Sequence, residues 1–89
     1  MALQILDASP DSEGIVAQLR EAIERAIPGA GIDVRAASPG HYEIRVTTEV
    51  FAGQSRVKQH QIVYAAIAHL MSGDAPPVHA VDRLECQTP

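Results

Sequence analysis

Two short runs in which apolar and polar residues alternate constrain the fold of this 89-residue chain more than any other feature. The first run covers residues 32–36, the second covers residues 42–48, and Ser-Pro-Gly at residues 38–40 lies between them. Alternation with a period of two is typical of a strand with one buried face, and Ser-Pro-Gly is typical of a tight turn. The pattern therefore predicts two antiparallel strands, with His41 at the start of the second.

An amphipathic helix is expected before the strands, because apolar side chains recur at three- and four-residue steps over residues 15–27. Ser9 is predicted to cap this helix, with Pro10 at its first position, although the helix-disfavouring Gly14 leaves a start near Ser12 as an alternative. Pro28-Gly29 is expected to end it. A second helix is expected after the strands. It is predicted to begin at an N-cap Ser55 and to end before Gly73.

The last segment, residues 79–87, has the composition of a strand, but its apolar positions slip out of step by one residue. A β-bulge near Asp82 or Arg83 would bring these positions back into phase. A strand-helix-strand connection generally returns parallel and right-handed to the same sheet. We therefore expect a small single α+β domain over residues 1–89, with a three-stranded mixed sheet backed by helices. Residues 1–9 are expected to be flexible.

Charge and motif content exclude several classes of function. The chain has 7 basic and 11 acidic residues and a formal net charge of −4, whereas a strong nucleic-acid binder is basic. The common phosphate-binding, metalloprotease and hydrolase motifs are absent, so no enzyme is expected. The single cysteine, Cys86, cannot form an internal disulfide, and no apolar run is long enough to cross a membrane. These features favour a cytoplasmic protein without membrane contact.

Residues 51–64 carry the most specific pattern in the sequence. It matches the spacing Phe-x-Gly-x-Ser-x-Val-x-Arg-His-x-x-Val-Tyr at Phe51, Gly53, Ser55, Val57, His60, Val63 and Tyr64. A second match is His-Ala-Val at residues 79–81, followed by Thr-Pro at the end of the chain. On these residues the sequence resembles the BolA family, and the resemblance extends from roughly the first helix to the C-terminus.

The resemblance implies an α-β-β-α-α-β arrangement like a type II KH domain, in which the second helical region splits into a short turn and a longer helix. It also implies that the protein pairs with a monothiol glutaredoxin and shares a bridging [2Fe-2S] cluster with that partner and its glutathione. His79, which begins the last strand, would supply one ligand, and no cluster is expected in the isolated apo protein. An imidazole donates less strongly than a thiolate, which raises the cluster potential and eases ligand exchange.

Other residues have roles that the resemblance leaves open. His41 is either a turn residue or a second metal ligand, if the second and third strands pair in parallel and bring it near His79. His60 is expected to be packed and hydrogen-bonded. The residues assigned to a partner or nucleic-acid surface are Gly53, Ser55, Arg56, Lys58 and His60. Those assigned a structural role in the motif are Phe51, Val57, Val63 and Tyr64.

The sequence departs from the family pattern in ways that bear on function. Gln59 replaces the usual arginine and removes a positive charge, which disfavours DNA binding. The C-terminal segment from residue 79 is one residue longer, in agreement with the predicted bulge, and the loop between the first two strands lacks an additional His or Cys. Two alternatives to the adaptor stay open, and a weak homodimer is possible with any of these functions. The alternatives are a transcriptional regulator linked to stress response and cell morphology, which binds DNA through its KH-like helix-turn region, and a structural or stress-response scaffold without metal.

Overall fold

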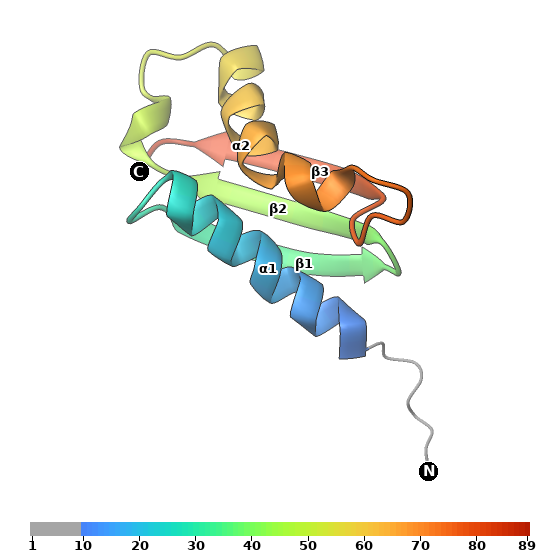
Figure 1. The fold of residues 1–89 in the computed structure, drawn as a ribbon. Coiled ribbons are helices and arrows are strands. Elements are labelled where there is room, and N and C mark those ends of the chain that lie inside the picture. The colour runs from blue at the N-terminus through green and yellow to red at the C-terminus, as the bar shows by residue number, and fades with distance from the viewer. Residues whose placement is uncertain (1–9) are drawn as a thin grey trace.

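The computed structural model describes residues 10–89 (Figure 1). Along the chain its elements are α1 (Pro10–Ala26), β1 (Gly31–Ser38), β2 (His41–Thr47), the 3-10 helix η2 (Glu49–Phe51), α2 (Arg56–Met71) and β3 (Ala80–Gln87). The expected element order is therefore confirmed, and the short member of the predicted helix pair is a 3-10 helix of three residues. The capping role of Ser9 and the flexibility expected of residues 1–9 lie outside the described residues.

The three strands form one mixed sheet in the order β1-β2-β3. β1 pairs with β2 in antiparallel orientation, and β2 pairs with β3 in parallel orientation. The register of β3 shifts by one residue, because Tyr42 pairs with Val81 whereas Glu43 pairs with Arg83. Asp82 is therefore the extra residue of a bulge, and the phase slip in the sequence is confirmed as a structural feature.

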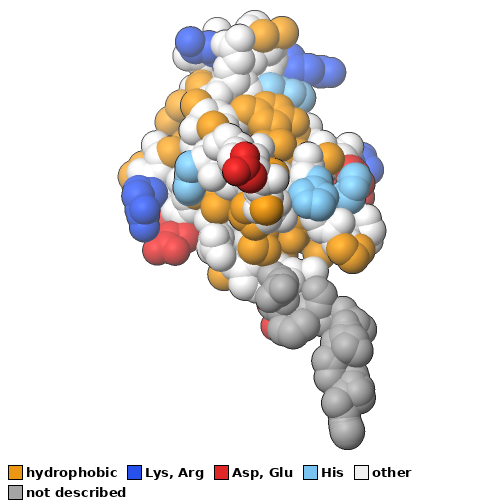
Figure 2. All heavy atoms as spheres, turned by 45° about the vertical axis from the view of Figure 1, so that its right-hand side comes forward, with side chains coloured by type: hydrophobic (Ala, Val, Ile, Leu, Met, Phe, Trp, Pro, Cys, Tyr) orange, Lys and Arg blue, Asp and Glu red, His pale blue; other side chains and the backbone are white. Residues whose placement is uncertain are grey.

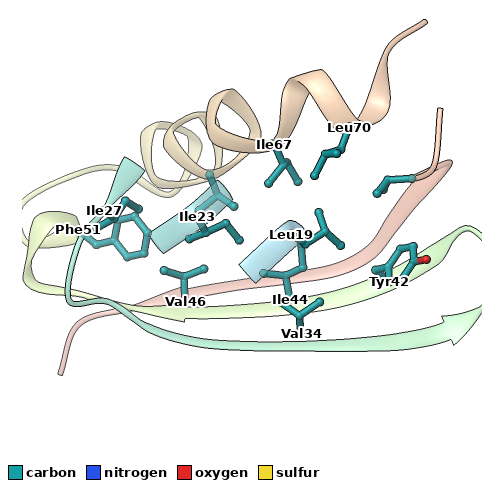
Figure 3. Packing of buried hydrophobic residues seen from close by; sticks show 12 residues of the cluster. Leu19, Ile23, Ile27, Val34, Tyr42, Ile44, Val46, Phe51, Ile67 and Leu70 are labelled. Carbon is teal, nitrogen blue, oxygen red and sulfur yellow. The ribbon is translucent and has the colours of Figure 1, made fainter. Parts of the chain in front are cut away.

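Both helices pack on the same face of the sheet, and the apolar core lies between the two layers (Figures 1 and 3). Helix α1 contributes Leu19 and Ile23, which share one face of the helix, and Ile27 continues the four-residue step directly after the helix ends. The buried core consists of Leu19, Ile23, Ile27, Val34, Tyr42, Ile44, Val46, Phe51, Val63, Ile67, Leu70 and Val78. In the described part of the chain, no helix is long and apolar enough to span a membrane.

The other face of the sheet carries charged side chains whose signs alternate across neighbouring strands. The register pairs are Asp33 with Arg45, Arg35 with Glu43, Glu43 with Arg83, and Arg45 with Glu85. Ion pairs follow this register, at 3.4 Å between Arg35 and Glu43 and at 2.9 Å between Arg45 and Glu85. Cross-strand pairs of opposite charge favour this register over one shifted by a residue, which would turn the apolar set outward.

The chain between β2 and α2 is shaped by short polar contacts. The side chain of Thr48 accepts a hydrogen bond from the backbone N–H of Val50 and caps η2, which inserts Phe51 into the core. Ser55 then caps α2, since its hydroxyl oxygen accepts a hydrogen bond from the backbone N–H of Lys58 at 3.1 Å. The predicted N-cap is thus confirmed, while β2 ends at Thr47, before the point that the sequence pattern indicated.

The four motif residues that were assigned a structural role differ in burial. Phe51 and Val63 are buried in the core. Val57 and Tyr64 lie outside the core, with exposed fractions of 66% and 37%. Val57 and Tyr64 are seven residues apart and share a face of α2 that lies about 100° around the helix from Val63. The helix turns the face of Val63 toward the sheet, so the other face is left in solvent.

Candidate functional site

His79 is held by the backbone on either side of it. Val78 is fully buried, and its N–H donates a hydrogen bond to the carbonyl of Leu70 in the last turn of α2 at 3.0 Å. The N–H groups of His79 and Ala80 both donate to the carbonyl of Gly40, at 2.8 and 3.1 Å. The side chain of His79 is nevertheless exposed. The fold thus fixes the position of this residue directly before β3 and leaves its imidazole exposed to solvent.

His41 lies at the same end of the sheet. It follows Gly40 directly, and in the parallel register of β2 and β3 it pairs with Ala80, the residue after His79. The conditional prediction that parallel pairing brings the two histidines to one sheet end is therefore confirmed. Figure 2 turns this end toward the viewer and shows histidine side chains gathered beside one another on the surface.

The surroundings of His41 include one carboxylate. Nδ1 of His41 lies 2.9 Å from Oδ1 of Asp82, the residue that the bulge inserts into β3. The side chains are 41% and 43% exposed, so the pair lies at the surface. Sequence reasoning placed the bulge correctly but missed this contact, because the two residues are 41 positions apart along the chain.

Among the described residues, the side chains at this sheet end that could bind a metal are too few to form a complete site. No group of three or more His, Cys, Asp or Glu side chains that could hold a metal ion occurs among residues 10–89 described by the structure. His41 and His79 could supply two imidazole nitrogens, and a [2Fe-2S] cluster takes four protein ligands, of which two can be histidines on one iron. The donor set therefore fits a cluster that is completed by ligands from another molecule.

The residues assigned to a partner or nucleic-acid surface lie at the opposite end of the sheet. Gly53, Ser55, Arg56 and Lys58 are exposed around the first turn of α2. Arg56 and His60 line a groove of about 320 Å³ whose other wall is the C-terminal half of β3. The structure does not bring this surface together with His41 and His79. His41 begins β2 and His79 directly precedes β3, whereas the surface lies where these two parallel strands end.

His60 corrects one expectation. It is half-buried, as its position between the core and the solvent face of α2 suggested. Its side chain makes no hydrogen bond to the residues that the structure describes, so the expected hydrogen-bonded role was wrong. Across the groove from His60 lie Leu84, Glu85, Cys86 and Gln87 of β3.

Gln59 has a structural role that sequence reasoning missed. Its side-chain amide donates hydrogen bonds to the carbonyls of Phe51 at 3.1 Å and of Gln54 at 3.2 Å. These contacts tie the first turn of α2 to the segment that leads into it. The sequence signal for this role was that Gln59 stands where the family pattern has an arginine. Both side chains carry N–H donors.

Two groups have pKa values that depart from the ordinary range. The pKa of Glu85 is lowered, mainly because Arg45 donates a hydrogen bond to it and the positive charge of Arg83 lies close by. Burial raises the pKa of the Cys86 thiol. A thiol of raised pKa holds little thiolate at neutral pH and is a poor nucleophile. The groove beside Cys86 therefore offers no activated cysteine.

A family model described as BolA-like protein matches residues 2–89. No curated protein matches the sequence. The BolA protein homologue from Coxiella burnetii superposes with a TM-score of 0.67 at 26% identity, over 82% of this chain and 88% of that one. BolA1 from Mus musculus gives 0.67 at 26% identity, over 92% and 68%. The BolA domain of SufE1 from Arabidopsis thaliana gives 0.69 at 18% identity, over 84% and 92%, which shows a shared fold.

Proposed function

Because this chain belongs to the BolA-like protein family, we propose that it is a non-enzymatic cytoplasmic adaptor that pairs with a monothiol glutaredoxin. The two proteins would share a bridging [2Fe-2S] cluster, with glutathione as a further ligand, in iron-sulfur trafficking or in iron and redox sensing. The cluster is the cargo of the pair and is absent from the isolated apo protein. It supplies the redox and transfer chemistry, whereas this chain supplies the ligands and the surface.

The observation that carries this proposal is the common position of His41 and His79 at one sheet end. The carbonyl of Gly40 accepts hydrogen bonds from the backbone N–H groups of His79 and Ala80. His41 directly follows Gly40 and begins β2. Both imidazoles can be reached from solvent. An exposed histidine on a fixed backbone can bind a metal that a partner presents, without rearrangement of the fold.

Imidazole ligation suits exchange of the cluster between proteins. A neutral imidazole binds iron through a nitrogen lone pair and brings no negative charge, so it leaves more readily than a thiolate. Two ligands from this chain would also be too few to hold the cluster alone. The proposed division of ligands therefore makes cluster binding depend on the partner.

The test is a titration of the apo protein into a glutathione-bound, cluster-loaded monothiol glutaredoxin, followed by visible circular dichroism. The wild-type protein is expected to produce a new spectrum, and His79→Ala is expected to abolish it. His41→Ala is expected to change the shape of this spectrum. His69→Ala serves as a matched control, because this exposed histidine in the last turn of α2 has no assigned role. A spectrum that is unchanged by the wild-type protein would contradict the proposal.

A second candidate function is DNA binding by a transcriptional regulator. It is supported by Arg56 and Lys58, which are both exposed at the first turn of α2 beside the groove. The net charge of −4 and the neutral Gln59 weaken it. Sequence-specific binding at physiological salt that is lost in the double variant Arg56→Ala, Lys58→Ala would favour this function. Binding confined to low salt would be non-specific attraction to phosphate.

A further inference from the structure

We propose that Asp82 is a positioning residue that holds His41 in the tautomer with the proton on Nδ1, so that Nε2 is the nitrogen available to bind iron. The role of His41 as a ligand rests on the proposed function. The tautomer and the ring orientation do not, because they are properties of the apo protein.

The bulge in β3 is what brings Asp82 to His41. Val81 still pairs with Tyr42, and Arg83 pairs with Glu43, so Asp82 is inserted without a partner residue of its own on β2. Two residues then oppose one, which re-aims the extra side chain relative to a regular strand. Its carboxylate reaches the neighbouring strand at His41, with 2.9 Å between Oδ1 and Nδ1. The additional residue in this segment thus has a specific contact.

The chemistry of the two groups decides which nitrogen carries the proton. An ionised carboxylate can only accept hydrogen bonds, so a neutral His41 must donate from Nδ1. The lone pair of the ring then lies on Nε2, at the side of the ring away from Asp82. Binding of a metal at Nε2 leaves the Nδ1 proton in place, so no proton has to be released on ligation.

The hydrogen bond also restricts rotation of a ring whose side chain is 41% exposed. Histidine ligands in metal sites commonly donate the other ring N–H to a carboxylate, which fixes the ring and increases its basicity. Asp82 would act on His41 in the same way. No equivalent side-chain contact holds the imidazole of His79 among the described residues, so the two ligands would differ in how firmly they are oriented.

The tautomer can be measured on the whole apo protein, without iron. Long-range ¹H–¹⁵N correlation spectra of uniformly labelled protein at pH 8 distinguish a ring protonated on Nδ1 from one protonated on Nε2. We expect Nδ1–H for His41 in the wild type and a shift to the ordinary Nε2–H form in Asp82→Ala. Asp82→Asn, whose amide oxygen can accept the same bond, is expected to restore part of the Nδ1–H form. Asp74→Ala, in the exposed segment before β3, is the control and should change nothing.

Effects on the cluster form the second measurement. In the loaded pair, Asp82→Ala is expected to alter the visible circular dichroism and to weaken cluster retention by about 10-fold or more, the usual effect of losing such a partner. A wild-type His41 protonated on Nε2, or a tautomer unchanged by Asp82→Ala, would overturn the proposal. If the wild-type protein does not bind the cluster but the tautomer behaves as stated, the proposed function fails and the positioning by Asp82 stands.

Discussion

The imidazole ring of His79 occupies the space that a side chain at residue 40 would need. A Cβ atom added to Gly40 would lie 2.7 Å from Nδ1 and 2.9 Å from Cγ of His79. Gly40 also has a φ of +81°, in the region that favours glycine. The turn between β1 and β2 and the position of the candidate ligand therefore depend on the same residue.

Gly40→Ala is expected to destabilise the protein and to displace the ring of His79. Gly29→Ala is a matched control, because Gly29 has a φ of +85° but no atom within 4 Å of its added Cβ. The control should lose about 1–2 kcal/mol from the left-handed backbone alone. Gly40→Ala should lose more in urea unfolding and should shift the imidazole signals of His79. Equal losses, with His79 signals unchanged, would show that the contact is unimportant.

Gln59→Ala is expected to lower the free energy of unfolding by about 1–2 kcal/mol, because it removes two hydrogen bonds to backbone carbonyls. Gln61→Ala, at an exposed position of the same helix, should change it by no more than about 0.5 kcal/mol. Gln59→Arg keeps N–H donors and should retain most of the stability. Chemical denaturation of the three variants measures these differences. A loss in Gln61→Ala as large as in Gln59→Ala would refute the assigned role.

Glu85 should make stability depend on pH in the acid range. Its pKa is lowered in the folded protein by Arg45 and Arg83, so its stabilising contribution is present above the ordinary value of 4.5 and is lost as the pH falls through the lowered pKa. Glu85→Gln should therefore be less stable than the wild type near neutral pH, with a difference that shrinks in acid. Added salt should also reduce it. Unfolding curves across pH measure this, and exposed Glu49, as Glu49→Gln, is the control. A difference that is constant with pH would contradict the assignment.

Cys86 should react slowly with iodoacetamide in the folded protein. Burial raises the pKa of its thiol, and only the thiolate attacks the reagent. At pH 8 the rate should rise when the chain is unfolded in urea. Ser72→Cys in the background Cys86→Ala places a thiol at an exposed position and should react faster than native Cys86. A folded rate as fast as that of the exposed thiol would show that Cys86 is activated after all.

Local patterns in the sequence were sufficient to predict the elements and their order. The alternation in two runs predicted β1 and β2, the steps of three and four predicted α1 and α2, and Ser55 was identified as the cap of α2. The phase slip predicted the bulge at Asp82. These features depend on the periodicity of side chains and on the preferences of turns and caps, which act over a few neighbouring residues.

The arrangement of the candidate site depended on contacts between distant parts of the chain. Periodicity shows which residues share a helix face, but the packing of α2 on the sheet decided that Val57 and Tyr64 are exposed. The sequence by itself determined that His41 and His79 stand at the starts of strands. Only the parallel pairing of β2 and β3 placed them at one end, set His79 against Gly40 and brought Asp82 to His41. Such contacts depend on the register between two strands that lie about 40 residues apart in the sequence. Short-range preferences do not determine that register.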